Sequence, residues 1–257
     1  MISSQKTSID FYYIACIINT IFFHIQRMAM YKIALFFLFS LPLFAGFFPQ
    51  TVHTSVKSVN GKNITLNSRF PVNGMSGVIV HNYGSGLTAI TSRMTQVSSN
   101  GGASLLNADV IDHDSLPTIK TAVRAGDKVI GGYLYNNILV LAPDADTYAK
   151  ITSAHNKKWV HPDLFALYMS ATGDGIPTRE NLANFAKKFQ VGLVYIVRRN
   201  AAVLFDPISG KVVGQKSMNG LPNEGKFPFY MRFKDLDSGW WFGSDVKGSY
   251  YNTIESI

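Results

Sequence analysis

The sequence predicts an α+β protein, in which an N-terminal β-rich lobe, built as a small barrel or a sandwich, precedes a smaller α+β lobe. Between residues 52 and 142, turn-forming residues recur about every eight to twelve positions, which is typical of short antiparallel strands. After Pro143 the apolar residues take helical spacing and helix-capping residues appear. We place the two lobes at residues 46–142 and 143–257, behind an N-terminal segment at residues 1–45.

The N-terminal segment predicts export. Lys32 precedes an apolar run, Ile33–Phe48, and the small residues Ala45 and Gly46 lie near its end. A basic residue, a short apolar core and small residues follow one another in this order in secretory signal peptides. We therefore expect cleavage close to Gly46, and a mature protein in the periplasm or on the cell surface.

Another apolar run lies upstream, at residues 11–23. It is shorter than the roughly 20 apolar residues that a membrane-spanning helix needs. We favour the interpretation that Met28 or Met30 is the true start and that residues 1–27 come from a start assigned too early. The alternative is that this segment is a membrane anchor. After cleavage of the signal we expect no stable membrane span.

The strands of the first lobe are bounded by glycine and asparagine turns. We expect strands at residues 52–58, 64–66, 78–80, 87–97, 103–111, 128–134 and 138–141. Asn60-Gly61 is a strong hairpin signal between the first two strands. The last two strands are expected to pair with each other across Asn136-Asn137.

Three helices are expected in the second lobe. Asp144 can cap the first of them, because its carboxylate can accept a hydrogen bond from the backbone of the first turn. Pro162 is suited to the first turn of the second helix, which ends at residues 173–175. The third opens after Pro177-Thr178, and its apolar residues fall on one face.

A nearly continuous apolar stretch, residues 191–197, follows these helices. A strand of this kind is usually buried on both faces of a sheet. We expect it to be the first strand of a three-stranded meander, which continues through residues 201–205 and 211–213. The second lobe therefore consists of helices followed by a small sheet.

Composition limits the chemistry of the mature protein. The only cysteine is Cys16, so the part after the signal has no disulfide and no thiol nucleophile. The net charge is +8, but the basic residues occur as pairs and not as a long basic run, so we expect no nucleic-acid partner. We expect no metal and no cofactor.

Two groups of residues contain side chains of the types found in metal sites and in hydrolase active sites. Asp109, Asp112, His113 and Asp114 offer oxygen and nitrogen ligands, but their spacing lacks the full set that a hard cation requires. The second group, which has the residue types of a hydrolase triad, consists of His161, Asp163 and Ser170. No strand–turn–helix elbow surrounds the serine. We therefore expect a protein that is not an enzyme.

The end of the chain is rich in aromatic residues. They are Phe227, Phe229, Tyr230, Phe233, Trp240, Trp241, Phe242, Tyr250 and Tyr251. We favour a segment that packs over the core; an exposed patch for a protein or glycan is the alternative.

Several stretches together resemble a known family. They are residues 125–129, Asn136-Asn137, residues 141–144 with Tyr148, and residues 191–197. From Val52 to Val213 the sequence resembles the N-terminal domain of plasminogen-binding protein A from epsilon-class proteobacteria. The resemblance implies an exported, envelope-associated domain with no known enzymatic role.

Family members named for plasminogen binding continue into long Lys/Glu-rich C-terminal regions, whereas this sequence stops at Ile257. Plasminogen kringles recognise a lysine beside a carboxylate, which a C-terminal lysine supplies and Ile257 does not. We therefore expect a structural, assembly or protein-docking module of the envelope. The alternative is an adhesin-like module that binds host plasminogen through its adjacent lysines, Lys157, Lys158, Lys187 and Lys188.

Overall fold

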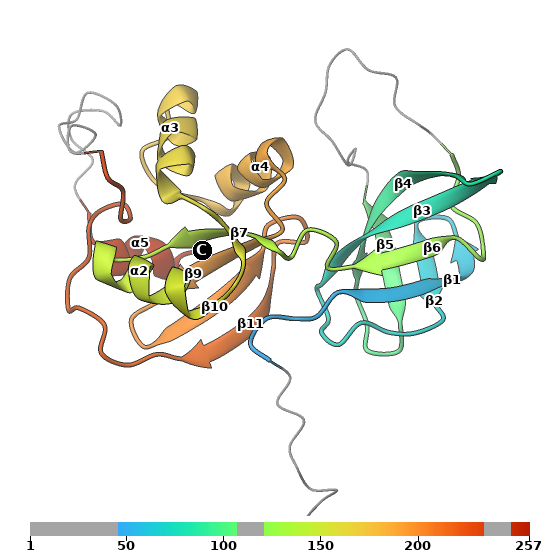
Figure 1. Ribbon diagram of the computed structural model, residues 1–257, viewed down its shortest axis with the longest axis horizontal. Coiled ribbons are helices and arrows are strands. Elements are labelled where there is room, and N and C mark those ends of the chain that lie inside the picture. The colour runs from blue at the N-terminus through green and yellow to red at the C-terminus, as the bar shows by residue number, and fades with distance from the viewer. Residues whose placement is uncertain (1–45, 107–120, 234–247) are drawn as a thin grey trace, which may run out of the picture. The chain divides into compact units, whose positions relative to one another are not determined.

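The computed structural model describes residues 46–106, 121–233 and 248–257, and these belong to one compact unit, Gly46–Ile257. This unit contains a closed six-stranded barrel, a five-stranded sheet and, in its described part, four short helices (Figure 1). The predicted α+β class is confirmed. Four predicted features lie outside the described residues: the signal segment, Cys16, the Asp109–Asp114 cluster and the residues Trp240, Trp241 and Phe242.

The first lobe is a barrel and not a sandwich. Its strands are β1 (Val52–Asn60), β2 (Asn63–Leu66), β3 (Ser76–Gly84), β4 (Leu87–Gln96), β5 (Gly102–Leu106) and β6 (Lys128–Gly131). They follow one another around the barrel in the order β1-β2-β5-β4-β3-β6, and every pairing is antiparallel. The predicted hairpin at Asn60-Gly61 joins β1 to β2.

Strand β6 closes the barrel because it pairs with β1 on one side and β3 on the other. Gly131 faces Val52 in β1 and Gly77 in β3. A side chain at Gly131 would not fit, since its Cβ would lie 2.5 Å from the ring of Phe70, which fills the barrel interior. Glycine at this position therefore lets a bulky aromatic residue occupy the centre of a small barrel.

The second sheet has five strands in the order β11-β10-β9-β7-β8. They are β7 (Asn137–Leu141), β8 (Lys158–Val160), β9 (Leu193–Val197), β10 (Ala201–Asp206) and β11 (Lys211–Ser217). Strands β9, β10 and β11 form the predicted antiparallel meander. Strand β7 runs parallel to both of its neighbours, β8 and β9.

The predicted pairing of residues 128–134 with residues 138–141 is wrong. The first segment closes the barrel, and the second becomes a central strand of the other sheet. Two successive turns, in which Tyr135 N–H donates to Gly132 O and Asn137 N–H donates to Leu134 O, lead the chain out of the barrel. Ile138 to Leu141 are then fully buried, as expected of a strand between parallel neighbours that is covered on both faces.

The helices are α2 (Ala145–Ala154), α3 (Pro162–Thr172), α4 (Arg179–Phe189) and α5 (Tyr250–Glu255). The first three were predicted, and the residues predicted to cap them are confirmed. Asp144 Oδ1 accepts a hydrogen bond from Thr147 N–H at 2.7 Å, Gly173 ends α3 with a left-handed φ of 78°, and Thr178 forms a capping box with Asn181. Within the described ranges, no helix has the length and apolar character needed to cross a membrane.

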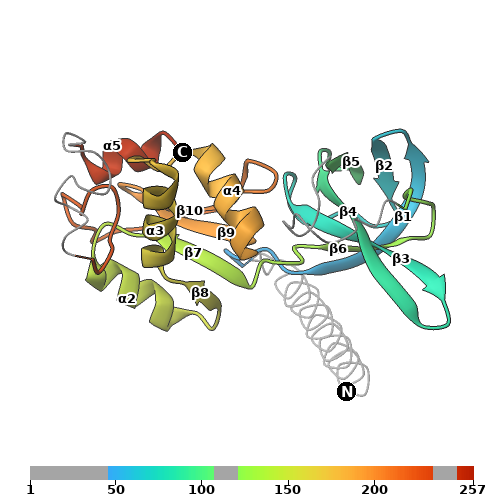
Figure 2. The same ribbon diagram turned by 90° about the horizontal axis from the view of Figure 1, so that it is seen from above.

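The two faces of the second sheet are covered differently. Side chains of α3, α4 and α5 cover one face, and the buried aromatic residues Phe229, Tyr250 and Tyr251 belong to this layer. The other face is covered by α2 and by Phe47 and Phe48 from the segment before β1. Figure 2 shows α2 and α5 on opposite sides of the strands. The prediction that the aromatic end of the chain packs over the core is confirmed for these described residues.

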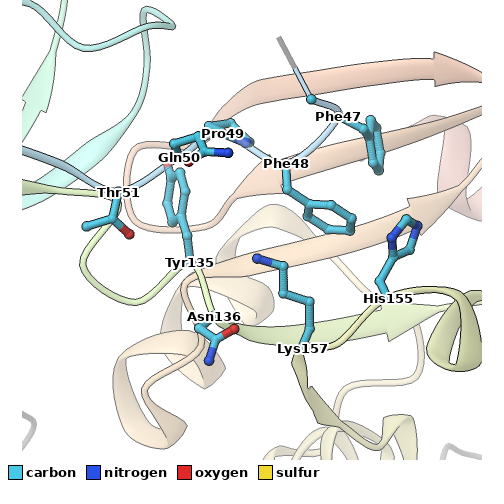
Figure 3. Close-up of a pocket in the computed structure, with 10 residues that line it drawn as sticks. Phe47, Phe48, Pro49, Gln50, Thr51, Tyr135, Asn136, His155 and Lys157 are labelled. Atoms are coloured by element: carbon cyan, nitrogen blue, oxygen red, sulfur yellow. The ribbon is translucent and has the colours of Figure 1, made fainter. Parts of the chain in front are cut away.

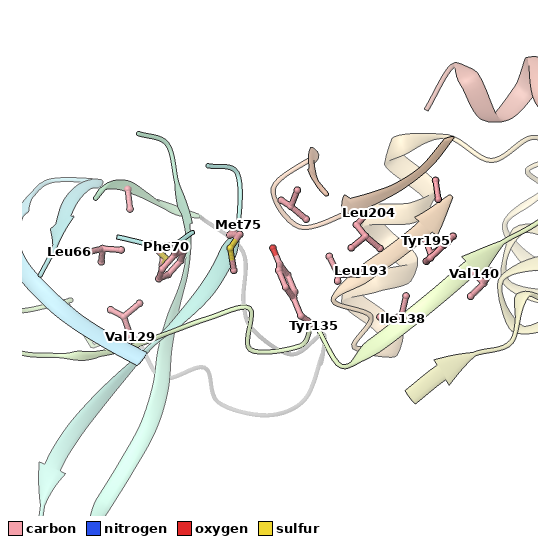
Figure 4. Packing of buried hydrophobic residues seen from close by; sticks show 14 of the residues in the cluster. Leu66, Phe70, Met75, Val129, Tyr135, Ile138, Val140, Leu193, Tyr195 and Leu204 are labelled. Atoms are coloured by element: carbon pink, nitrogen blue, oxygen red, sulfur yellow. The ribbon is translucent and has the colours of Figure 1, made fainter. Parts of the chain in front are cut away.

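A single apolar cluster runs from the barrel interior to the second sheet (Figure 4). Phe70 and Met75 belong to its barrel end, Leu193 and Leu204 to its sheet end, and Tyr135 lies between them. Because the barrel and the sheet share this cluster, removal of either would expose apolar surface on the other.

Candidate functional site

The four lysines predicted to bind a partner lie on two elements. Lys157 directly precedes β8 and Lys158 is its first residue, and Lys187 and Lys188 occupy the last turn of α4. Lys158 and Lys188 are exposed, whereas Lys157 and Lys187 are half-buried. The ammonium group of Lys157 lies 5.0 Å from the centre of the Phe48 ring. In each adjacent pair, therefore, one lysine is exposed and the other is partly covered.

The residues considered for a hydrolase triad are not arranged as one. His161 caps α3, because its Nδ1 accepts a hydrogen bond from Asp163 N–H at 3.1 Å. This nitrogen therefore has no proton to donate to the Asp163 carboxylate, which lies 3.2 Å away. Ser170 lies nine residues beyond His161, about 13 Å along the helix axis at the rise of an α-helix.

The Asp163 carboxylate is instead paired with Arg232. It accepts hydrogen bonds from Arg232 N–H at 2.9 Å and from Arg232 Nε at 2.7 Å. Burial is the largest single effect and opposes the charged carboxylate, but the two hydrogen bonds from Arg232, together with the charges of His161 and Arg232, outweigh it and lower the pKa of Asp163. Burial also lowers the pKa of His161, so the neutral ring that caps α3 is favoured.

A second carboxylate, Asp206, is fully buried where β10 ends. Its Oδ2 accepts hydrogen bonds from Ser76 N–H at 2.9 Å and from the Tyr135 hydroxyl at 2.7 Å. Its Oδ1 accepts from Ile208 N–H at 2.9 Å and Ser209 N–H at 3.1 Å. Burial raises the pKa of Asp206 although these donors oppose the shift. Asp206 thus connects β3 of the barrel, the connection between the sheets and the turn before β11.

A pocket lies where the segment before β1 crosses the second sheet (Figure 3). Its volume is about 640 Å³. The residues that line it are Gly46, Phe47, Phe48, Pro49, Gln50, Thr51, Tyr135, Asn136, His155 and Lys157. They come from three separate stretches of the chain: the segment before β1, the connection from β6 to β7, and the loop between α2 and β8.

Aromatic rings hold the first of these stretches in place. The Phe47 ring meets those of Phe48 and Tyr195 edge to face, with centroids 5.1 and 5.4 Å apart. The Phe48 ring meets His155 in the same way at 4.9 Å. Gly214 in β11 allows the close approach, since a Cβ there would lie 2.7 Å from Phe47 O. The end of the predicted signal run thus belongs to the folded unit.

Positive charge gathers around these rings. Lys157 lies over Phe48, and Lys216 Nζ lies 4.6 Å from the centre of Phe47 and 5.6 Å from that of Tyr195. Burial, followed by repulsion from Lys216 and then Lys157, lowers the pKa of His155. Burial also lowers the pKa of Lys216 and raises that of Tyr195 to about 12, so the phenol stays neutral. The pocket is therefore both aromatic and cationic.

From the sequence, Lys157 was chosen as a candidate binding residue because it is adjacent to Lys158. His155 and Lys216 were not chosen. The spacing of these residues carries no local motif, because their side chains meet only after β8 and β11 have taken their places in the sheet. A cationic pocket is compatible with the mild basic excess of the sequence but cannot be located from it. Within the described ranges, no group of three or more His, Cys, Asp or Glu residues is placed to hold a metal ion.

The fold and the pocket define a barrel-and-sheet domain with an aromatic, positively charged recess. The family model described as "Plasminogen-binding protein pgbA N-terminal" matches residues 51–256, and the chain belongs to this family. The predicted resemblance is confirmed, and the match extends beyond Val213 into α5.

One curated relative is the plasminogen-binding protein PgbA of Helicobacter pylori (strain ATCC 700392 / 26695). It is 24% identical to this chain over 127 residues, which are 48% of this chain and 27% of the relative. The match therefore spans about a quarter of that relative's length. No solved structure matches the chain.

Proposed function

We propose that this protein is an exported, envelope-associated docking module, which acts by binding another protein and not by catalysis. Membership of the family supports a protein-binding role, because the family description refers to the binding of plasminogen. Two prominent buried ionisable groups serve the fold. Asp206 links the barrel to the sheet, and the Tyr250 hydroxyl donates to Val197 O at 2.7 Å and also lies 3.0 Å from Leu141 O.

The observation that carries the proposal is the composition of α3. Its inner face buries Phe165, Ala166 and Met169 against the sheet. Its outer face carries Leu164 and Leu167, which are 37% and 41% exposed and lie one turn apart. A surface helix normally has a polar outer face, and neighbouring apolar side chains on such a face are typical of a protein contact.

Site-specific photo-crosslinking in the cells that make the protein tests the proposal. A benzoylphenylalanine at Leu164 or Leu167 should produce a discrete adduct with one envelope protein, because each side chain points away from the protein's own core. The same probe at Leu87, a leucine of barrel strand β4 that is 65% exposed, is the matched control and should give no such adduct.

Two outcomes would refute this docking surface. One is the absence of any adduct from α3 in cells where the protein fractionates with the envelope. The other is the same set of adducts from all three positions, which would indicate random encounters. Recovery of the protein only in the cytoplasm would refute the localisation.

Plasminogen is the second candidate partner. It is favoured by the name of the relative and by the exposure of Lys158 and Lys188, since a kringle needs a lysine side chain that it can enclose. Lys157 suits this role less well because its ammonium group lies over Phe48. If the lysines bind plasminogen, replacing Lys158 and Lys188 together by alanine should abolish capture.

A further inference from the structure

The pocket beneath residues 46–51 has an unusual balance of charge. Lys157 and Lys216 are half-buried, and in the described part of the chain neither ammonium group has a carboxylate within ion-pairing distance. Burying a cation costs free energy unless it is paired. The rings of Phe47, Phe48 and Tyr195 compensate for part of this cost, because the faces of aromatic rings attract cations.

The shape of the pocket matches a small organic molecule. A volume of about 640 Å³ lies within the roughly 300–1,000 Å³ typical of small-molecule sites. Figure 3 shows the side chains of Phe48, His155 and Lys157 turned toward the same space. Phe48 and His155 already contact each other edge to face, so an aromatic ring in this space would lie beside the pair and could make contacts of the same kind with them.

We propose that this pocket binds a small aromatic carboxylate. The ring of the ligand packs against Phe48 and His155, and its carboxylate takes a charge-assisted hydrogen bond from Lys157, which lines the pocket. An anion is favoured because Lys157 lines the pocket and Lys216 adds positive charge beside Phe47, whereas no carboxylate is among the lining residues. The site is independent of the apolar face of α3, so either proposal can fail without the other.

Isothermal titration of the purified full chain with three matched probes tests the proposal. Phenylpropanoate, phenylpropanol and phenylpropylamine share one ring and chain and differ in the charge of the end group. We expect phenylpropanoate to bind, phenylpropanol to bind at least about tenfold more weakly because it lacks the charge, and phenylpropylamine not to bind.

Substitutions then locate the site. Lys157→Met keeps most of the unbranched side chain and removes its charge, and it should weaken phenylpropanoate binding by about tenfold. Lys158→Met is the matched control, since Lys158 is adjacent to Lys157 and exposed, and it should leave the affinity unchanged.

Several outcomes would overturn the proposal. They are no binding of phenylpropanoate at millimolar concentration, equal binding of all three probes, and equal weakening by Lys157→Met and Lys158→Met. The comparison of probes uses the unaltered protein, so it remains decisive if a variant fails to fold.

Discussion

At the level of single residues, two carboxylates hold distant segments together. Asp206 accepts four hydrogen bonds in a fully buried position, and one of them comes from Ser76, 130 residues earlier in the chain. In the sequence, Asp206 is the first residue of a turn motif with Pro207. The structure contains this turn, in which the Asp206 carboxylate accepts hydrogen bonds from Ile208 N–H and Ser209 N–H. Its bonds to the barrel have no local signature.

Asp206→Asn should lower the free energy of unfolding by about 2–4 kcal/mol. Each carboxylate oxygen of Asp206 accepts two hydrogen bonds, and in asparagine an NH₂ group replaces one of these oxygens. The two donors that faced this oxygen then meet another donor and lose their acceptor in a buried position. Urea denaturation measures the effect. Tyr135→Phe, which removes a single donor to Asp206, is the matched control and should cost about 1 kcal/mol. Equal losses in the two variants would contradict the role assigned to the carboxylate.

Asp163 should stabilise the fold in a pH-dependent manner. Its folded-state pKa is lowered below the ordinary 3.8, so its contribution is present above that value and is lost as the pH falls through the folded-state pKa. The difference in unfolding free energy between the wild type and Asp163→Asn should therefore be constant at neutral pH and shrink below about pH 4.

Urea denaturation between pH 3 and pH 7 measures this difference. Arg232→Gln removes the partner of Asp163, so it should reproduce the same pH dependence. A difference that stays constant across the range, or grows on acidification, would show that the Asp163–Arg232 pair does not hold the carboxylate in its charged form.

At the level of elements, the parts of the fold that depend on local sequence were predicted well. Asp144, Pro162 and Thr178 mark the starts of α2, α3 and α4 because capping involves residues within one turn of each other. The apolar stretch that contains β9 was also predicted, since burial on both faces leaves no polar alternation.

The pairing of β6 and β7 could not be predicted in the same way. Both strands are short, and the Asn136-Asn137 pair between them suits a hairpin as well as a connection between two sheets. The choice depends on contacts distant in sequence: β6 pairs with β1 and β3, and β7 pairs with β8 and β9. Local turn residues carry no information about such partners.

Val194→Asp in β9 should lower the free energy of unfolding by about 4 kcal/mol, because it places an unpaired charge where Val194 is fully buried. Val212→Asp in β11 is the matched control: the same residue type, in the same sheet, is 40% exposed there. It should change stability by about 1 kcal/mol or less. Melting of both variants within a degree or two of the wild type would show that β9 is not central to the sheet.

At the level of the whole molecule, the unit that holds the barrel and the second sheet begins at Gly46, the residue near which cleavage of the signal is expected. We predict that the mature chain starts within a few residues of Gly46 and that residues 1–27 are not made. Mass spectrometry of the protein isolated from the envelope measures its N-terminus. A peptide from residues 3–11 in the mature product would contradict both statements.

The aromatic and cationic pocket could not be predicted from the sequence, because it exists only in the assembled unit. Phe48 comes from the segment before β1 and Lys157 from the loop before β8, and Lys216, which adds charge beside Phe47, belongs to the edge strand β11. The apolar outer face of α3, in contrast, can be recognised once the helix register is known. The lysine pairs, chosen because they are adjacent in sequence, each contain one partly covered member.

The central claim is that the protein docks through an apolar helix face and not through lysines held for a kringle. Surface plasmon resonance of plasminogen over the immobilised protein, with and without a free lysine analogue, tests it most directly. We predict weak binding at most, weakened further by salt and abolished by the analogue, because Lys158 and Lys188 are single exposed charges on separate elements. Tight, analogue-sensitive binding that is lost in Lys158→Ala/Lys188→Ala and retained in Leu164→Ser/Leu167→Ser would contradict the account.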